Sequence, residues 1–429
     1  MKFLTSGYES FETPYSRALE VVSRFLDPVS IEDLTIGTDS TCDIPISTEF
    51  LRKISEQKFS HKEHFFDQPI IMNNGNADYL SSIVYMLNYT QEIDSDDLDN
   101  LGRFKFEHSY QSKFSVVSED LVKRYSLELI EATPKLKAHR KTAPMRSKVF
   151  LSHDNDVFYG SLRYDGFAAL KQGRIDWLVQ IVFRELFKNP YWFNMDQIMK
   201  IEDEYDVKST FFWLINQGPV KVEGIEKPLR NADYDFGSTS VQACFSRIEN
   251  SQWENGLHKS ISSESFKEEN QKLGKQAIAN RNHYLKLNYP GHFEELDEGG
   301  IKVDSSMGFA EMPGWRNSFS QPYCPVDMRS NKPFDCIEVP LAIMDTTYWT
   351  YLKYPPSKVR SSILDLLESY SNDALFGILW HNKYFTKYKF RGYLEVYKAI
   401  LLWMKENEVK SIQPDEIVAA REKDNFQSW

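Results

Sequence analysis

The chain has 429 residues, of which 41% are hydrophobic, 26% charged and 14% aromatic. This length allows two or three domains, and the composition is typical of a globular protein with an aromatic-rich core, which excludes a disordered or fibrous chain. The 62 acidic and 51 basic residues leave a net charge of −11. Because a phosphate backbone attracts a basic surface, we do not expect nucleic acid as the principal partner.

The sequence offers no candidate membrane span or export signal. Its longest strongly apolar stretches, such as residues 399–404, are far shorter than the roughly 20 residues that cross a bilayer. The N-terminal segment lacks the apolar core of a secretory signal. The cysteines form no CxxC pair and are too few for a disulfide scaffold, so we expect a reducing, cytoplasmic location; they are Cys42, Cys244, Cys324 and Cys336.

A break in composition near residues 132–147 divides the chain. This stretch has two prolines, a run of basic residues and few apolar ones, which is typical of a linker. We therefore predict an N-terminal α+β domain of unknown role over residues 1–131, a linker over 132–147, and a second domain over 148–429. Within the first domain, helical spacing of apolar residues predicts a helix over 79–87. An acidic turn follows at 94–102, which lacks the glycine and glutamate that complete a calcium-binding loop.

Strand and helix patterns alternate in the second domain. Strands separated by helices predict a mostly parallel sheet or barrel, in which reactive groups gather at the carboxyl ends of the strands. We expect strands near residues 148–151, 207–214, 243–248, 301–304, 337–343 and 374–379. We expect helices over 174–187, 263–279, 358–369 and 391–407.

The first of these strands ends in Ser152-His153-Asp154-Asn155-Asp156. Side chains two residues apart on a strand share a face, so Asp154 and Asp156 point the same way and repel each other. A metal ion held by one carboxylate, with the other free to accept a proton from water, would resolve this conflict and form a hydrolytic site. The alternative is a turn with two solvated aspartates.

Polar residues recur at the end of each later segment. One of these groups alone is weak evidence for a site, because a lone histidine is more often a packed or surface residue. The series as a whole favours one shared site. The groups are His258 after Gly256-Leu257, Arg281-Asn282-His283-Tyr284, Asp304-Ser305-Ser306-Met307-Gly308, Gly314-Trp315-Arg316, Asp345, and His381-Asn382.

This series resembles the polysaccharide deacetylase family of carbohydrate esterases, which remove N-acetyl groups from sugars with a divalent metal. More narrowly, it is similar to the bacterial branch with a His-Asp-x-Asp first motif and an uncharacterised N-terminal domain, which residues 79–104 resemble, especially 99–104. The catalytic resemblance covers about residues 149–382. It implies an α/β fold: a distorted (β/α) barrel of the polysaccharide deacetylase type, preceded by a smaller α+β N-terminal domain.

The resemblance also implies a metal site. Asp156 and His258 match metal ligands of the family, whereas Ser262 stands where the family commonly has a second histidine. We expect His283 as the third ligand, with His153 and His292 as weaker alternatives. A carboxylate and imidazoles with an open position suit Zn²⁺, and iron, cobalt or nickel are alternatives.

Catalytic roles follow from the same resemblance. Asp154 would be the general base, kept ionised by Arg281, which Asp304 would orient. His381 would be the general acid, since an imidazole titrates near neutral pH, and Asp345 would hold its tautomer.

Three residues are candidates for the substrate-binding site. Trp315 and Arg316 would form the sugar subsite, although core packing for Trp315 and a structural ion pair for Arg316 are equally open. Tyr284 would stand at the rim, where a nearby backbone N–H could stabilise an oxyanion.

These roles predict a metal-dependent hydrolase that removes an N-acetyl group from an amino sugar or glycan precursor. The main alternative is a catalytically degenerate carbohydrate-binding or scaffold protein, which the substitution at Ser262 favours. A different amide hydrolase with a non-sugar substrate is a third possibility.

Overall fold

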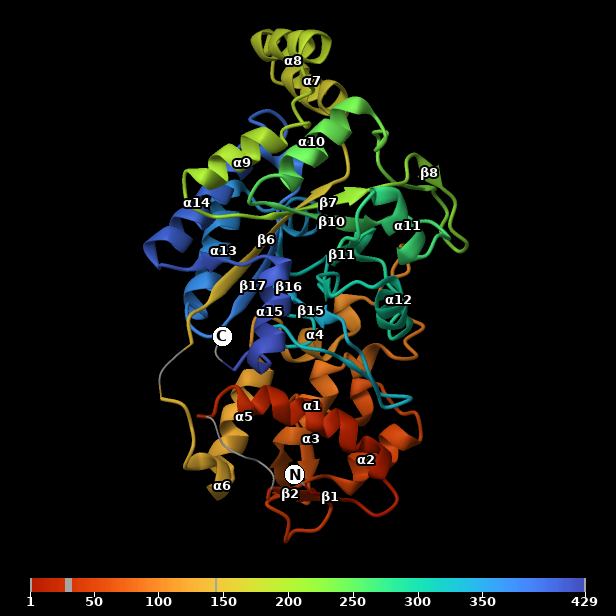
Figure 1. Ribbon diagram of the computed structural model, residues 1–429, viewed down its shortest axis with the longest axis vertical. Coiled ribbons are helices and arrows are strands. Elements are labelled where there is room, and N and C mark those ends of the chain that lie inside the picture. Colours follow the sequence, from red (N-terminus) through yellow and green to blue (C-terminus); the bar gives the residue numbers. More distant parts are fainter. Residues whose placement is uncertain (1, 28–32, 143–144, 428–429) are drawn as a thin grey trace.

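The computed structural model describes residues 2–27, 33–142 and 145–427, and a parallel sheet forms its centre (Figure 1). Every strand pair in this sheet is parallel, as the alternation of strands and helices predicts. The path runs β15-β12-β11-β10-β7-β6-β17-β16, with β18 pairing with β6. The strands are β6 (Lys148–Asn155), β7 (Thr210–Leu214), β10 (Glu254–Lys259), β11 (Ala279–Asn282), β12 (Val303–Asp304), β15 (Ile337–Glu338), β16 (Leu341–Met344), β17 (Leu375–Leu379) and β18 (Lys410–Ser411).

The chain connection between β15 and β16 closes this sheet into a distorted barrel. These strands lie at opposite ends of the path, yet only Val339 and Pro340 separate them. Three peptide units span at most about 11 Å, so the two edges of the sheet must lie side by side. One bent segment thus pairs first with β12 and then with β17. The α/β barrel expected from the sequence is confirmed.

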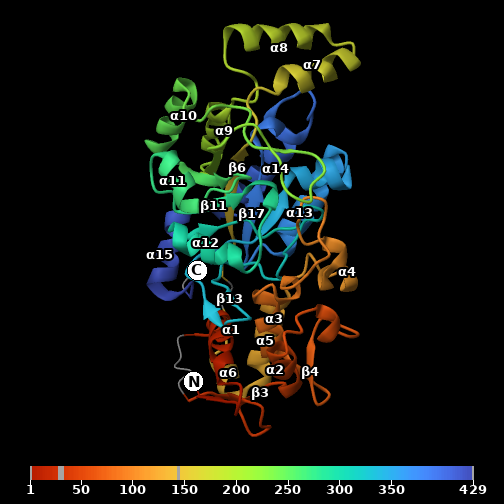
Figure 2. The same ribbon diagram turned by 90° about the vertical axis from the view of Figure 1, so that its right-hand side faces the viewer.

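Helices cover the barrel, and its central strands are buried. All residues of β7 and β17 are buried. Figures 1 and 2 show the helices around the sheet and the α7–α8 pair projecting from one end. The helices are α7 (Ser161–Lys171), α8 (Ile175–Phe187), α9 (Met195–Asp203), α10 (Thr239–Glu249), α11 (Phe266–Leu273), α12 (Gly291–Gly299), α13 (Pro356–Ser369), α14 (Tyr393–Glu406) and α15 (Pro414–Asp424). No described helix is long and apolar enough to cross a bilayer.

Three expected elements differ from the structure. The single strand expected near 337–343 is two strands, β15 and β16, which pair with different neighbours. The strand expected near 243–248 is wrong, because this segment lies inside α10, whose buried residues Val241, Cys244, Phe245 and Ile248 are three to four apart. The strand follows as β10 and contains His258 itself. The helix expected over 263–279 ends early, because Gly274 adopts φ 84° at its C-cap.

The N-terminal region is α+β. It contains a three-stranded parallel sheet and a β-hairpin beside its helices. The helix predicted over 79–87 is confirmed as α3. The strands are β1 (Lys2–Leu4), β2 (Thr35–Gly37), β3 (Ile44–Pro45), β4 (Ile71–Asn73) and β5 (Asn76–Asp78), and the helices are α1 (Glu12–Ser23), α2 (Thr48–Ser55), α3 (Tyr79–Leu87), α4 (Tyr110–Phe114), α5 (Leu121–Ala132) and α6 (Pro134–Lys137).

The division into domains at 132–147 stays a prediction. Helix α6 lies within the expected linker, and residues 143–144 of that linker lie outside the described residues. Two further two-stranded sheets extend from the barrel loops: β8 (Pro219–Val220) with β9 (Leu229–Arg230), and β13 (Val326–Asp327) with β14 (Lys332–Pro333).

The segment Gly314-Trp315-Arg316 joins the N-terminal region to the barrel. Gly314 has φ 124°, and a Cβ there would lie 2.2 Å from the Val117 carbonyl oxygen, so only glycine allows this approach. The Trp315 N–H donates to the same carbonyl at 2.8 Å. The Arg316 guanidinium donates to both carboxylate oxygens of Glu92, at 2.8 and 2.5 Å.

The sugar subsite expected from Trp315 and Arg316 is therefore corrected. Trp315 is fully buried and packs edge-on against Tyr370 at 4.7 Å between ring centroids. Arg316 is 3% exposed, and its guanidinium is fully engaged by Glu92 and the Gly308 carbonyl. The Trp315 ring packs inside the barrel and Arg316 pairs with the N-terminal region, so neither side chain is free to meet a sugar.

Breaking the Glu92–Arg316 pair tests this structural role. Arg316→Ala leaves the Glu92 carboxylate buried without its partner, which typically costs about 3–5 kcal/mol. We expect such a fall in the free energy of unfolding, measured by urea denaturation. Arg124→Ala, which removes a half-exposed ion pair with Glu119, should cost less than about 1 kcal/mol. Near-equal losses in the two variants would contradict the assignment.

The shifted pKa of Glu254, the first residue of β10, predicts that the free energy of unfolding depends on pH. Burial, reinforced by Asp415, raises the pKa of Glu254 to about 8. The folded state therefore retains a proton that the unfolded chain releases near its ordinary pKa, so stability falls as pH rises from about 4.5 to about 8.

Glu254→Gln removes this ionisation. We expect the variant to gain at least about 1 kcal/mol over the wild type at pH 8.5 and almost nothing at pH 4.5, measured by chemical denaturation across this range. Glu226→Gln, at an exposed loop position, should show no such pH-dependent gain. A constant difference between Glu254→Gln and wild type at all pH values would disprove the raised pKa.

Candidate active site

The polar residues singled out in the sequence gather where the parallel strands end. Asp154 lies on β6 and Asp156 follows it, His258 lies on β10, Arg281 lies on β11, and His283 comes directly after β11. Asp345 follows β16, and His381 comes two residues after β17. Since the carboxyl ends of parallel strands meet at one end of a barrel, residues separated by more than 200 positions in the chain become neighbours.

Asp156, His258 and His283 form one cluster whose ligand atoms all lie within 4.8 Å of one another. Asp156 Oδ1 lies 3.1 Å from His258 Nε2 and 3.6 Å from His283 Nδ1. The two histidine nitrogens are 3.1 Å apart. Among the described residues, this is the group of histidine, cysteine and carboxylate side chains close enough to hold a metal ion.

Hydrogen bonds on the outer side of each imidazole fix the tautomers of the cluster. His258 Nδ1 lies 2.8 Å from the Arg281 carbonyl oxygen, and His283 Nε2 lies 2.8 Å from the Arg230 carbonyl oxygen. A carbonyl only accepts, so each of these nitrogens carries the proton. In the neutral rings, the nitrogens that face each other and Asp156 then carry lone pairs.

Three lone-pair atoms that face one another need a cation between them. Asp156 Oδ1 is buried and has no hydrogen-bond donor in proper geometry among the described residues. Carboxylate and imidazole ligands whose outer atoms are held by carbonyls are the usual surroundings of a catalytic divalent metal. The residues present therefore fit a metal of this kind.

The charge states of the cluster also suit a metal. Burial opposes a charge on Asp156, but the facing imidazoles, led by His283, hold the pKa of Asp156 well below its ordinary value. Burial lowers the pKa of His283 to about 4. Near neutral pH these two groups are thus an anion and a neutral imidazole, the forms that bind metal. For His258, Asp154 and Asp156 outweigh burial and raise the pKa, so a proton competes there with a metal.

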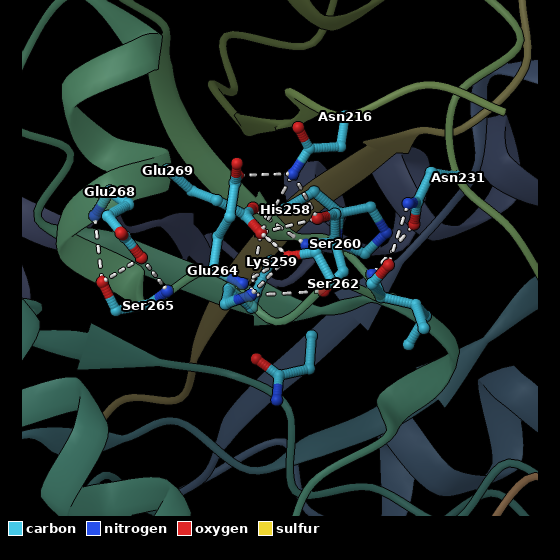
Figure 3. Close-up of polar contacts among 12 residues, drawn as sticks. Asn216, Asn231, His258, Lys259, Ser260, Ser262, Glu264, Ser265, Glu268 and Glu269 are labelled. Carbon is cyan, nitrogen blue, oxygen red and sulfur yellow. Dashed lines mark hydrogen bonds and ion pairs between the residues drawn. The ribbon is translucent and has the colours of Figure 1, made fainter. Parts of the chain in front are cut away.

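Ser262, which the sequence resemblance aligned with a common histidine position, belongs to a separate network (Figure 3). Its hydroxyl donates to Glu269 Oε1 at 2.8 Å, as does the ammonium of Lys259 at 2.8 Å. The Ser260 hydroxyl donates to the same oxygen at 2.6 Å. Glu269 is fully buried, so these donors are needed to offset its desolvation. This network fixes the loop after β10, and His283 supplies the third side chain of the cluster.

The two alternative third ligands lie elsewhere. His153 is fully buried, with Nδ1 2.6 Å from the Trp380 carbonyl oxygen and Nε2 2.8 Å from Glu202 Oε1. His292 Nε2 lies 3.1 Å from Asp304 Oδ2. Both imidazoles make these other contacts, so neither takes part in the cluster.

The expected base and its guanidinium partner are in contact. Arg281 Nη1 donates to Asp154 Oδ1 at 3.2 Å and to the Ser152 hydroxyl at 2.7 Å. Asp154 Oδ2 lies 3.6 Å from His258 Nε2 and so faces the cluster. One carboxylate oxygen is thereby held by a cation, while the other faces the place where the lone pairs converge.

The expectation that Asp304 orients Arg281 is corrected. Arg281 Nε donates to the Ser305 carbonyl at 2.8 Å and Nη2 donates to the Ser305 hydroxyl at 3.0 Å. Asp304 instead accepts hydrogen bonds from Asn280 and Ser306 and contacts His292. Side chains alternate along an extended segment, so Asp304 and Ser305 face opposite ways.

His381 and Asp345 are paired as expected. His381 Nδ1 lies 2.8 Å from Asp345 Oδ1, and the other carboxylate oxygen accepts the backbone N–H of His381. Asp345 is fully buried. This arrangement places the proton on Nδ1 and leaves Nε2 3.5 Å from Asp156 Oδ2, directed at the cluster.

Two cavities meet at the cluster. The smaller, of about 140 Å³, is lined by Asp154, Asp156, His258, His283 and His381 among others. The larger, of about 830 Å³, shares Asp156, His283, Tyr284, Thr346 and Lys383 with it. The sequence did not identify the walls of the larger cavity, which are aromatic and basic: Tyr159, Arg163, Tyr164, Trp192, Arg230, Trp349, Tyr384, Lys389 and Phe390.

The N-terminal region supplies a further residue that sequence reasoning missed. Arg103 lines the smaller cavity, and its Nη1 donates to the Tyr284 carbonyl at 3.0 Å. Its Nη2 donates to the Tyr351 hydroxyl at 2.9 Å, and Asp99 holds its Nε at 2.8 Å. Residues 99–104 carried the resemblance of this region, but nothing in their local pattern indicated that they reach the barrel mouth.

Tyr284 is at the rim, as expected. It lines both cavities, and its hydroxyl donates to the Arg230 carbonyl at 3.0 Å. Its φ of 61° is rare for a residue with a side chain. The contacts of its hydroxyl and its carbonyl fix this conformation.

No family model and no curated protein sequence matches the chain. Solved structures match it. One, from Mycobacterium smegmatis, is provisionally assigned as a polysaccharide deacetylase and is 14% identical to this chain, with a TM-score of 0.40. The match covers 66% of this chain and 91% of that protein's chain. A peptidoglycan deacetylase of Bacillus subtilis is 12% identical with a TM-score of 0.32, covering 67% and 98%. A carbohydrate esterase family 4 pseudoenzyme of Bacillus anthracis is 12% identical with a TM-score of 0.32, covering 64% and 66%. These structures bear the family name that the sequence motifs resemble, but likenesses this low say nothing about the chemistry of this chain.

Proposed function

We propose that the chain is a metal-dependent hydrolase that removes an N-acetyl group from an amino sugar or glycan precursor. One observation carries this proposal: Asp156, His258 and His283 direct lone pairs at one point in a cavity that also receives Asp154 and His381. A metal cluster alone would fit a structural site. A second carboxylate and a buried His–Asp pair beside it are the parts of a hydrolytic site.

Asp156, His258 and His283 would hold the ion. The donor set favours Zn²⁺, with iron, cobalt and nickel as alternatives, and the ion supplies Lewis acidity for the amide carbonyl and the attacking water. The protein must also keep Asp156 charged and His283 neutral, as their shifted pKa values do near pH 7.

Asp154 would accept the proton of the attacking water. Its Oδ1 accepts from Arg281, so Oδ2, which faces His258, is the oxygen available for the proton. Water adds to the acetamide carbon as this proton leaves. Arg281 is itself anchored by Ser152 and Ser305, and therefore holds the carboxylate in place through the reaction.

His381 would donate a proton to the departing amine. Its Nδ1 proton is held by Asp345, which leaves Nε2 as the atom that faces the cavity. As the C–N bond breaks, Nε2 gives its proton to the amine nitrogen, and acetate and a free amino sugar result. Asp345 thereby keeps the ring oriented with Nε2 toward the cavity during this transfer.

The larger cavity suits a sugar that carries an anionic group. Its aromatic rings offer stacking faces for a pyranose, and four cations line it: Arg163, Arg230, Lys383 and Lys389. The carboxylates in its wall are Asp156 and Asp233, and Asp233 is occupied by the backbone N–H groups of Phe158 and Tyr159. These residues take the role that the sequence assigned to Trp315 and Arg316.

The metal ligands are tested by elemental analysis of the purified protein. Asp156→Ala, His258→Ala and His283→Ala should each lose the tightly bound ion, because two remaining ligands hold a divalent metal poorly. His108→Ala, at a partly exposed histidine in the N-terminal region, should retain it in the wild-type amount. An ion that stays tightly bound to Asp156→Ala would refute the cluster.

Catalysis is tested by acetate release over a panel of N-acetylated sugars and sugar phosphates. Asp154→Asn removes the proton acceptor but no ligand, so we expect unchanged metal content and a fall in kcat of about 100-fold or more. The alternative, a degenerate carbohydrate-binding protein, predicts binding of a sugar without acetate release from the metal-loaded wild type. That result would overturn the proposal that the chain is a hydrolase.

A further inference from the structure

The α7–α8 hairpin exposes many large apolar side chains. Nine of the sixteen exposed large hydrophobic side chains among the described residues lie on residues 161–187. Eight of them are exposed between 45% and 71%: Leu162, Phe167, Leu170, Ile175, Val179, Phe183, Leu186 and Phe187. Exposed apolar residues scattered singly are normal, but a group of this size on one element marks an interaction surface.

The spacing of these residues places them on a distinct helix face. On α8, Ile175, Val179, Phe183 and Leu186 follow one another at three- and four-residue steps and so line one side of the helix. The opposite side of α8 is already used, because Trp177 and Ile181 are buried against Ala169 and Tyr388. The hairpin therefore has its own small core, and the exposed stripe is an additional face.

The hairpin stands away from the rest of the molecule. Figures 1 and 2 both show α7 and α8 at one extremity of the long axis, beyond the barrel helices. Its base is the loop at 383–391: the Lys389 N–H donates to Asp165, and Tyr388 packs edge-on against Trp177 at 5.4 Å between centroids. A convex tip of this kind suits a flat partner better than a groove.

The charges around the apolar face are basic, although the chain as a whole is acidic. Residues 161–188 contain five basic and three acidic residues, and residues 383–391 contain four basic and no acidic ones. The three acids are engaged: Asp165 by Trp192, Asp176 by Arg174, and Glu185 by Ser161. The exposed cations Lys171 and Lys188 have no ion-pair partner among the described residues and directly follow Leu170 and Phe187.

We propose that the α7–α8 hairpin docks the protein onto an anionic lipid bilayer. An apolar helical face with lysines at its edges lies in the interface plane, with the lysine ammonium groups among the lipid headgroups. A second copy of the chain is the less suitable occupant, because an isologous contact would bring like-charged hairpins together. Arg163 and Tyr164 of α7 also line the large cavity, so the hairpin that docks is part of the wall of that cavity.

The test is cosedimentation of the full-length protein with vesicles. We expect binding to phosphatidylcholine vesicles containing about one third phosphatidylglycerol to exceed binding to pure phosphatidylcholine by about tenfold or more, and to weaken with salt. Phe183→Glu/Leu186→Glu should lower binding to the anionic vesicles about tenfold, and Lys171→Glu/Lys188→Glu should remove the preference for them.

Phe66→Glu is the matched control, since Phe66 is 63% exposed in the N-terminal region. It should bind vesicles like the wild type, and all variants should keep the wild-type unfolding midpoint because each change is at an exposed position. Equal binding by Phe183→Glu/Leu186→Glu and wild type, or no binding of the wild type to anionic vesicles, would overturn the proposal. So would a wild-type dimer, without lipid, that this double variant converts to monomer.

Discussion

The register of two neighbouring strands sets the chemistry of the site. His258 on β10 pairs directly with Arg281 on β11, and the Arg281 carbonyl accepts from the outer nitrogen of that imidazole. The same Arg281 sends its guanidinium to Asp154. One residue thus fixes a tautomer through its backbone and the position of a carboxylate through its side chain. A shift of one residue in this register would turn one of these two side chains to the other face of the sheet, away from its partner.

The N-terminal region completes the barrel mouth. Arg103 reaches the carbonyl of Tyr284 and the hydroxyl of Tyr351, so the rim of the site is held from outside the barrel. The buried Glu92–Arg316 pair and the Gly314–Val117 contact hold the N-terminal region against the barrel. Tyr284 keeps a left-handed backbone, which is costly for a residue with a side chain, under these combined constraints.

A short segment of the chain joins the candidate active site to the α7–α8 hairpin. Asp156 follows β6, and α7 begins at Ser161, only five residues later. Tyr164 of α7 stacks on Trp192 at 5.7 Å between centroids, and Lys389 lies over the Tyr164 ring at 4.5 Å. The cavity wall and the base of the hairpin are therefore the same packed group of side chains. Any movement of the hairpin would alter the shape of the cavity.

The sequence by itself determined the barrel class and most residues at the strand ends, but it did not predict β11 or β18 as strands. Alternation along β6 is a local property, so the residue pattern alone places Asp154 and Asp156 on one face. The same reasoning failed at residues 243–248, where a short apolar run fits both a strand and a helix face. The three- and four-residue spacing of the apolar residues from Val241 to Ile248 was the signal that favoured the helix.

Only the tertiary structure decided which side chains share the site. The fold places His283 in the cluster, and not His153 or His292. It pairs Asp304 with His292, and it places Trp315 and Arg316 at the contact with the N-terminal region. It also brought Arg103 to a cavity formed by residues far away in the chain. These outcomes depend on strand register and on packing between distant segments. Local residue patterns do not indicate register or long-range packing, because the closure of the barrel determines which residues are neighbours in space.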